Sequence, residues 1–487
     1  MYLGLDLGTS GLKALLIDEN QSILAVATAP LIVSRPAEGW AEQEPANWIA
    51  ACRTVLVELK QSRRKEMAAL RGIGLSGQMH GATLIDSAGE PLRASILWND
   101  TRASKEAAEL DAHPLMRDIT GNIVFPGFTA PKVNWIRTHE PDIFKKIDKI
   151  LLPKDYLRLW LTGEIVSEMS DAAGTSWLNV GQRDWSDDAL AATGLLREHM
   201  PDLVEGSETS GRLRKEIAQE FGLPDGITVA GGGGDNAASA IGTGVVNEGE
   251  AFLSLGTSGV LFVANSEYRP NPASAVHTFC HALPNRWHQM GVILAATDAL
   301  NWLSNILNTP AQQLVGELGR DLIDPGHTCF LPYLGGERTP HNDSRIRAGF
   351  VGLSHADDRL ALVRSVLEGV SFAFKDCQLA LAETGTTFSS CLAVGGGSKS
   401  EYWLKLLATI LNQPLDIPEN GEYGGAFGAT RLAILATENV TEAEICTKPP
   451  IIRTIEPDTT KFEVYNTAYM NFRSLYPALK NLGHGSP

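Results

Sequence analysis

The chain has 487 residues, with 41 lysines and arginines and 57 aspartates and glutamates, which gives a formal net charge of −16 at pH 7. This length is sufficient for two or three domains, and an apolar content of 44% is typical of folded proteins. The acidic balance argues against nucleic acid or an anionic membrane as the main partner, because both require clustered positive charge. A small phosphate ligand held by backbone N–H groups stays compatible with it.

The composition predicts a cytoplasmic protein. No run of about 18 apolar residues is present, so we expect no membrane-spanning helix. The first residues contain Asp6 where a signal peptide would have an apolar segment. The six cysteines are scattered and form no C-x-x-C motif, which is typical of free thiols in a reducing compartment.

A short sequence occurs twice, about half a chain apart. Residues 5–11 read Leu-Asp-Leu-Gly-Thr-Ser-Gly, and residues 253–259 read Leu-Ser-Leu-Gly-Thr-Ser-Gly. Strand-like runs flank both copies, at residues 1–7, 12–17, 251–255 and 260–263. Each copy therefore predicts a β-hairpin with a glycine-containing tip. The hydroxyl and N–H groups of such a tip can bind an anion.

A second pair of segments has the order strand, glycine turn, helix. In the first, four glycines separate the strand at residues 227–230 from Asp235 and Asn236, which begin an alanine-rich helix. In the second, residues 395–397 separate the strand at residues 391–394 from another helix. Helix N-termini attract anions, so both turns are candidate contacts for a phosphate or a nucleotide.

Together the two pairs predict two similar α/β lobes with a catalytic cleft between them. We expect the first lobe over residues 1–245 and the second over residues 246–487, with a further helix after residue 450. The glycine runs match neither the P-loop pattern nor the Rossmann pattern. Any one of them is explained by tight packing alone, and it is the combination of four that favours ligand binding.

Two carboxylates lie beside these turns. Asp6 lies in the first hairpin, at the position where the second hairpin has Ser254, so the fold does not require a carboxylate there. Asp6 is therefore a candidate for orienting Mg²⁺ through water. Asp235 can serve as the N-cap of its helix and as a general base that accepts the proton of an alcohol. Lys13, just past the first turn, either reaches a transferred phosphate or is a solvated lysine at a strand edge.

A polar acceptor site is expected in residues 76–81, Ser-Gly-Gln-Met-His-Gly, which separate two short strands. Gln78 and His80 are polar groups in a loop flanked by glycines, where function often lies. Farther along, Trp98, Asp100 and Arg102 follow a third strand, and strand alternation would place them on one face. An aromatic ring with Asp, Arg and His suits a polyol, which presents hydroxyls on all sides.

These segments resemble the FGGY carbohydrate kinases. The resemblance rests on both Leu-Gly-Thr-Ser-Gly sequences, on Gly-Gly-Gly-Asp-Asn and on the late Gly-Gly-Gly-Ser, and it runs from residue 1 to about residue 440. Further segments are similar to family members that act on D-xylulose, at residues 77–81, 98–100, 126–132, 152–156, 170–175 and 336–341. The implied fold is α/β, with two ribonuclease-H-like lobes of the actin-like ATPase architecture, and the family expectation is a homodimer.

The resemblance implies ATP-dependent phosphorylation of D-xylulose to D-xylulose 5-phosphate, with ATP and Mg²⁺ as the donor. Asp235 would be the catalytic base, and Asp6 would support Mg²⁺ and the phosphates. The candidate sugar contacts are Met79, His80, Gln78, Asp100 and Asn236. The candidate ATP contacts are Gly8, Thr9, Ser10, Lys13, Gly256, Thr257, Ser258, Gly396, Gly397 and Ser400.

Two alternatives remain open at this point. A kinase that acts on ribulose, gluconate or glycerol would share the reaction, because the shape of the pocket sets the substrate. An actin-like ATPase without a sugar substrate would share the fold, because one architecture carries several functions. The Gln-Met-His and Trp-Asn-Asp segments favour a polyol site over such an ATPase.

Overall fold

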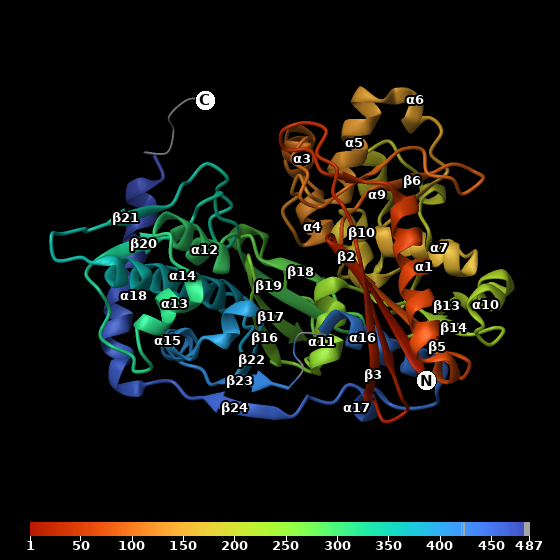
Figure 1. Ribbon diagram of the computed structural model, residues 1–487. Coiled ribbons are helices and arrows are strands. Elements are labelled where there is room, and N and C mark those ends of the chain that lie inside the picture. Colours follow the sequence, from red (N-terminus) through yellow and green to blue (C-terminus); the bar gives the residue numbers. More distant parts are fainter. Residues whose placement is uncertain (420, 422–423, 482–487) are drawn as a thin grey trace.

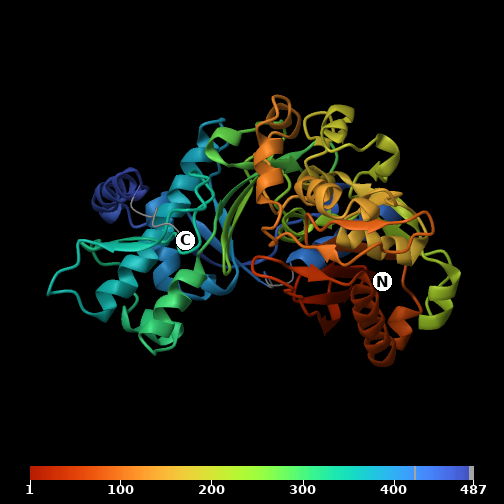
Figure 2. The same ribbon diagram turned by 90° about the horizontal axis from the view of Figure 1, so that it is seen from above.

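The computed structural model describes residues 1–419, 421 and 424–481. Two lobes lie side by side, and each contains a seven-stranded mixed sheet with helices packed on it (Figure 1, Figure 2). Among the helices within the described residues, none combines the length and the apolar character that crossing a membrane would require.

The first sheet has the order β13-β14-β5-β1-β2-β3, with β15 also paired to β5. Its strands are β1 (Tyr2–Leu7), β2 (Gly11–Ile17), β3 (Ile23–Pro30), β5 (Gly72–Gly77), β13 (Thr209–Arg212), β14 (Thr228–Ala230) and β15 (Gly233–Gly234). Strand β1 is antiparallel to β2 and parallel to β5. The first predicted hairpin is therefore confirmed as β1–β2.

The second sheet has the order β18-β19-β17-β16-β22-β23-β24. Its strands are β16 (Ala251–Leu255), β17 (Gly259–Asn265), β18 (His277–Cys280), β19 (Trp287–Ile293), β22 (Cys391–Val394), β23 (Leu415–Pro418) and β24 (Ile451–Ile455). Strand β16 is antiparallel to β17 and parallel to β22, which is the relation of β1 to β2 and β5. The sequence repeat thus marks a duplicated topology, and the prediction of two similar α/β lobes is confirmed.

Helix α16 (Gly424–Thr437) packs on the first sheet although it lies in the second half of the sequence. Glycines in the sheet permit this approach: a Cβ atom at Gly4 would lie 2.1 Å from the Ala426 carbonyl oxygen, and one at Gly74 would lie 1.8 Å from that of Ala429. The chain therefore returns to the first lobe, and this helix departs from a simple division of the sequence at residue 245.

Helix α16 also lies against α11 (Asp235–Thr243). A Cβ atom at Gly428 would lie 1.7 Å from the carbonyl oxygen of Ala238, so the two helices approach with backbone nearly touching backbone. The start of α16 is close to the first hairpin, since a Cβ atom at Gly425 would lie 3.0 Å from Asp6 Oδ2. This helix pair consequently places the beginning of α11 beside β1.

The lobes are also joined by a buried contact away from these helices. Asn122, in the first lobe, completes the edge of β18: its Nδ2 donates to the Thr278 carbonyl oxygen at 2.8 Å, and its Oδ1 accepts from the Thr278 N–H at 2.9 Å. Phe128 and Phe279 are buried at the same junction, with ring centroids 6.1 Å apart. The helix predicted after residue 450 is α18 (Phe462–Leu479), which packs on the far side of the second lobe (Figure 1).

Candidate active site

The tip of the first hairpin is a closed turn with exposed hydroxyl groups. The Gly8 N–H donates to the Gly11 carbonyl oxygen at 3.0 Å, and the Ser10 side chain is exposed. Lys13 is the cross-strand partner of Asp6 in the β1–β2 register, so its position is set by the hairpin. The structure therefore brings the predicted residues of the first phosphate segment to the same end of the hairpin as Asp6.

Gln78 lies behind this turn and forms hydrogen bonds to protein groups through both ends of its amide. Its Oε1 accepts from Thr9 Oγ1 at 2.9 Å, and its Nε2 donates to Gln43 Oε1 at 3.0 Å. Gln43 in turn donates to the Thr9 carbonyl oxygen at 2.8 Å, and Trp98 Nε1 donates to Thr9 Oγ1 at 2.9 Å. Gln78 thus supports Thr9, and its contact with a sugar stays a prediction. The residue pattern around Gln43 contained no signal for this role.

Asp100 departs from the prediction. Its carboxylate is buried and accepts from Arg102 Nε at 3.0 Å, from Arg102 Nη2 at 2.7 Å and from the Ala41 N–H at 2.6 Å. Strand β7 (Ser95–Ile96) ends before this segment, so the expected alternation does not occur and Trp98 is exposed while Asp100 is buried. With its oxygens paired inside the protein, Asp100 is a structural residue and not a sugar contact.

Asp6 is a buried carboxylate at the end of β1. Burial raises its pKa, and the neighbouring Ser76 hydroxyl and the charge of Lys13 oppose this rise. Ser76 is its partner on the parallel strand β5. A carboxylate and a hydroxyl on adjacent strand ends give a compact group of oxygen atoms at the tip of the first hairpin.

Asp235 is the first residue of α11, and Gly234 occupies the N-cap position. Its Oδ1 accepts hydrogen bonds from the N–H and the Nδ2 of Asn236, at 2.7 and 3.0 Å. Burial by the surrounding protein raises the pKa of Asp235 to about 6; the Asn236 hydrogen bonds oppose the rise and the charge of Asp6 adds to it. The residue is nevertheless open to solvent, so a ligand can reach this carboxylate.

Met79 and His80 follow β5 and lie next to this helix start. A Cβ atom at Gly234 would be 3.0 Å from Met79 Cγ, which places Met79 against the residue that precedes Asp235. His80 Nδ1 lies 2.7 Å from the Gly174 carbonyl oxygen. Because a carbonyl only accepts, Nδ1 carries the hydrogen and Nε2 is left as an acceptor. Burial lowers the pKa of His80 to about 3, so the ring, stacked on Phe128 at 4.5 Å, is neutral.

The tip of the second hairpin is held by the start of α12 (Thr297–Ile306). The Thr297 N–H donates to the Gly256 carbonyl oxygen at 2.9 Å, and the Ala296 N–H donates to that of Thr257 at 2.8 Å. The side chains of Thr257 and Ser258 are exposed. This turn is therefore fixed through its carbonyl groups, while its hydroxyl groups face outward.

The late glycine turn lies at the end of β22, beside the end of β16. Gly396 is exposed, with open space where a Cβ atom would be. Gly397 is buried, and a Cβ atom there would lie 2.8 Å from the Leu255 Cβ. The Ser400 hydroxyl accepts from the Trp403 N–H at 3.1 Å and caps α15 (Glu401–Leu411). Of these residues, Gly396 offers the open face for a ligand.

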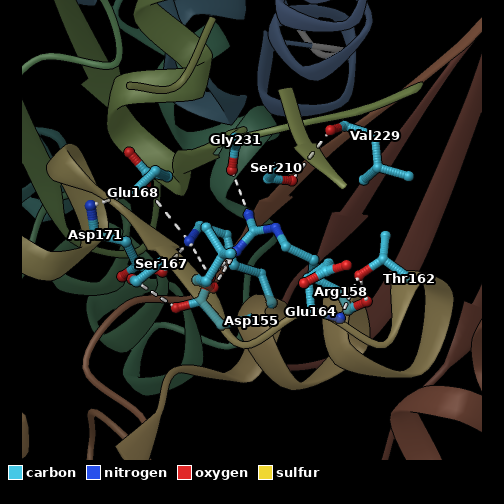
Figure 3. Close-up of polar contacts among 12 residues, drawn as sticks. Asp155, Arg158, Thr162, Glu164, Ser167, Glu168, Asp171, Ser210, Val229 and Gly231 are labelled. Atoms are coloured by element: carbon cyan, nitrogen blue, oxygen red, sulfur yellow. Dashed lines mark hydrogen bonds and ion pairs between the residues drawn. The ribbon is translucent and has the colours of Figure 1, made fainter. Parts of the chain in front are cut away.

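A buried charge network lies behind the glycine turn that precedes Asp235 (Figure 3). Lys154 is fully buried, and its Nζ lies 2.7 Å from Asp155 Oδ1, 3.3 Å from Glu168 Oε1 and 3.0 Å from Asp171 Oδ2. Arg158 shares Asp155, with its Nη1 2.6 Å from Asp155 Oδ1. Two cations thus lie among three acidic groups with no access to water.

This network holds both ends of the glycine turn. Arg158 Nη2 donates to the Gly231 carbonyl oxygen (Figure 3). At the other end, the Gly234 N–H donates to Ser170 Oγ at 3.0 Å, and that hydroxyl donates to Glu168 Oε2 at 2.8 Å. The sequence marked these segments only by resemblance, because the network forms between residues that are distant along the chain.

Comparisons with known proteins identify the family of this chain. The model of the N-terminal domain of the FGGY family of carbohydrate kinases matches residues 1–242, and that of its C-terminal domain matches residues 251–437. The chain is 46% identical to a xylulose kinase of Escherichia coli K12, over 98% of this chain and 99% of that protein.

Two solved structures extend the comparison. One is described as a xyloylose kinase from Brucella ovis. It is 59% identical to this chain, with a TM-score of 0.97, and the match covers 99% of each chain. A gluconate kinase from Lactobacillus acidophilus, with 24% identity and a TM-score of 0.92 over 99% of this chain and 98% of its own, shares the fold. The chain therefore belongs to the FGGY family of carbohydrate kinases.

Proposed function

We propose that this carbohydrate kinase transfers the γ-phosphoryl group of ATP to D-xylulose, giving D-xylulose 5-phosphate and ADP. The observation that carries the proposal is the carboxylate of Asp235, which is open to a ligand, has a pKa of about 6 and begins a helix beside Met79. The names of the Escherichia coli and Brucella ovis relatives support the choice of xylulose over gluconate, ribulose or glycerol.

In the proposed reaction Asp235 is the general base. Above about pH 6 its carboxylate is ionised and accepts the proton of the sugar hydroxyl while the hydroxyl oxygen forms a bond to the γ-phosphorus. The bond between that phosphorus and the oxygen of the leaving ADP breaks, and ADP takes the electron pair. Asn236 donates two hydrogen bonds to Asp235 and so fixes its orientation towards the hydroxyl.

The sugar would lie against Met79 and His80. The neutral His80 ring offers Nε2 as an acceptor for one sugar hydroxyl, because Nδ1 is engaged with Gly174. The sulfur and methyl group of Met79 provide an apolar wall next to the reacting end. Both residues are held by packing, which favours a fixed sugar orientation.

The phosphates of ATP would bind between the two hairpin tips, formed by Gly8, Thr9 and Ser10 and by Gly256, Thr257 and Ser258. The exposed hydroxyl groups of Ser10, Thr257 and Ser258 would be donors, with Lys13 beside them. The late turn of Gly396, Gly397 and Ser400 would lie under the adenosine, with Gly396 as the contact because it is open. Residues 1–245 and 246–487 would then form the two sides of the nucleotide site.

The residues near the first tip fit Mg²⁺. This ion prefers oxygen ligands and usually keeps several waters, and the Asp6 carboxylate with the Ser76 hydroxyl beside it offers such oxygen atoms. When bound with ATP, the ion would neutralise negative charge on the phosphates. Among the described residues no group of three or more His, Cys, Asp or Glu side chains forms a metal cage, so a water-mediated contact from Asp6 suits this site.

The six cysteines carry no disulfide, and five of them are buried, so the chain suits a reducing compartment, and we propose the cytoplasm.

The test is ADP release with D-xylulose, D-ribulose, D-gluconate and glycerol as acceptors. We expect D-xylulose to give the highest kcat/KM, and Asp235→Asn to lose at least about a hundredfold in kcat while still binding ATP. The control is Asp187→Asn, which changes an exposed aspartate at the start of α9 (Asp187–Ala192) and should act like the parent. ATP turnover that no sugar stimulates would overturn the proposal in favour of an ATPase.

A further inference from the structure

The segment Gly336–His341 contains Arg338, which has no role in the proposed mechanism. The residues on either side of Arg338 are fixed to the second lobe: Glu337 Oε1 accepts from the Leu294 N–H at 3.0 Å, and Thr339 Oγ1 accepts from the Val292 N–H at 3.0 Å. Arg338 lies between these two points of attachment. The segment therefore acts as a rigid support for one side chain.

The Arg338 side chain reaches the first lobe. Its guanidinium lies 4.6 Å from the ring centroid of Phe125, which belongs to the segment that also contains Phe128, the ring under His80. Its Nη1 lies 3.1 Å from His277 Nε2. The His277 ring lies 5.7 Å from that of Phe128, which stacks on His80, so the guanidinium contacts the aromatic cluster beside the proposed sugar contact.

The charge of Arg338 is not balanced by a carboxylate. Within residues 1–419, 421 and 424–481 the guanidinium has one side-chain hydrogen bond, to His277, and forms no ion pair with a carboxylate. Glu337 precedes it in sequence, but burial raises the pKa of that carboxyl to about 8, so it is mostly protonated at pH 7. The Arg338 side chain is only partly buried, so its other N–H groups can donate to a ligand.

The site has an order from one end to the other. Met79 lies against Gly234, which precedes Asp235, and Arg338 contacts Phe125 and His277 of the aromatic cluster that lies against His80. The sugar carbon that carries the reacting hydroxyl lies at the Asp235 end. An extended five-carbon ketose that begins there has its C1 hydroxyl and C2 carbonyl at the end of His80 and Arg338.

We propose that Arg338 is a substrate-anchoring residue, supplied by the second lobe, whose free N–H groups donate to the C1 hydroxyl oxygen of the ketose. This inference rests on the proposed function. It means that residues of both lobes bind the sugar. It also provides a reason for selectivity, because glycerol has two carbons fewer than a pentulose with which to reach from Asp235 towards Arg338.

The test compares Arg338→Met and Arg338→Lys with the parent, with D-xylulose and with 1-deoxy-D-xylulose as acceptors. A hydrogen bond to a charged group corresponds to roughly a tenfold to hundredfold rise in KM when it is lost. We expect Arg338→Met to raise the KM for D-xylulose by that factor and to leave the KM for ATP within about twofold. With 1-deoxy-D-xylulose, which lacks the contacted oxygen, parent and Arg338→Met should have similar KM values.

The control is Arg347→Met, which changes an exposed arginine of the same region whose side chain bonds only to backbone of its own loop. It should behave like the parent. Arg338→Lys keeps the charge but not the planar fork, so an intermediate KM for D-xylulose is expected, and it serves as the test variant if Arg338→Met does not fold.

The outcomes test the proposed function and the role of Arg338 separately. A parent enzyme that fails to phosphorylate D-xylulose overturns the proposed function and the inference with it. An active parent whose KM for D-xylulose is unchanged in Arg338→Met and Arg338→Lys overturns the inference alone. Equal rises in KM for D-xylulose and 1-deoxy-D-xylulose would also overturn it, because they would show a structural effect on the pocket.

Discussion

The negative charge of Asp6, at the end of β1, raises the pKa of Asp235, at the start of α11. These two acids lie in the first and last parts of the N-terminal family domain, and the packing of α11 and α16 beside β1 brings them together. Burial is the larger cause of the rise, and the charge of Asp6 adds to it, which gives Asp235 a pKa of about 6. The interaction therefore links the proposed magnesium-orienting residue to the proposed base.

The first prediction concerns the pH dependence of the reaction. Asp235 must be ionised to accept a proton, so kcat/KM should fall about tenfold per pH unit below pH 6, following its pKa. In Asp6→Asn the repulsion that favours protonated Asp235 is removed, so the pKa falls and the acid limb moves to lower pH. The measurement is the pH profile of kcat/KM, with Glu19→Gln as a surface control. If the acid limb of this profile lies at the same pH in Asp6→Asn as in the parent, the charge of Asp6 does not act on the pKa of Asp235.

The second prediction concerns His80. Because its pKa is held near 3, the ring does not titrate between pH 6.5 and 8, and the KM for the ketose should be constant over that range. His80→Ala removes the acceptor Nε2 and should raise the KM for ketose by about tenfold while leaving that for ATP near the parent value. The exposed His355 provides the control variant His355→Ala. Equal changes in both KM values would remove His80 from the sugar site.

The third prediction concerns the contact of α11 with α16. In Gly428→Ala the new methyl group would meet the backbone oxygen of Ala238, so the helices must separate, and we expect a loss of about 1–3 kcal/mol in unfolding free energy. Gly316→Ala, in the exposed helix α13 (Ala311–Glu317), meets no atom within 4 Å and should gain about 0.5–1 kcal/mol. Urea unfolding of both variants measures this, and equal midpoints would contradict the close contact.

The fourth prediction concerns the buried charge network. Lys154→Met leaves three acidic groups facing Arg158 alone, and removal of one partner from a buried ion pair costs about 3–5 kcal/mol. Lys145→Met removes an exposed pair with Asp142 and should cost less than about 1 kcal/mol. Thermal and urea unfolding give both values. A loss in Lys154→Met as small as in Lys145→Met would mean that the network does not hold the glycine turn.

Several elements of this architecture were predictable from local patterns. The Leu-Gly-Thr-Ser-Gly repeat marks β1–β2 and β16–β17, because a glycine-containing tip between two alternating apolar runs has few alternatives to a hairpin. The glycine turns before Asp235 and before Ser400 were also recognisable, because each has a run of glycines between an apolar strand and a helix. Such signals are contained within about ten residues, so a single sequence displays them.

The roles of Gln78 and Asp100 were not accessible in this way. Each is a polar residue in a loop, and a sequence cannot tell whether such a residue faces a ligand or a protein partner. Gln78 is occupied by Thr9 and Gln43, and Asp100 by Arg102 and the Ala41 N–H. The hydrogen-bond partners that occupy these two side chains come from other loops. The expectation that Trp98 and Asp100 share a face was wrong because the strand before them ends at Ile96, so the alternation of side chains stops there.

The sequence by itself determined the duplicated α/β topology, the glycine turns and the acid that starts α11, since each depends on residues that are neighbours along the chain. Only the tertiary structure decided which polar side chains form internal hydrogen bonds, that α16 returns to the first sheet, and that Arg338 of the second lobe reaches Phe125 of the first. The reason is physical: hydrogen bonds, close helix contacts and shifts in pKa depend on distances in space between segments that the linear order keeps far apart.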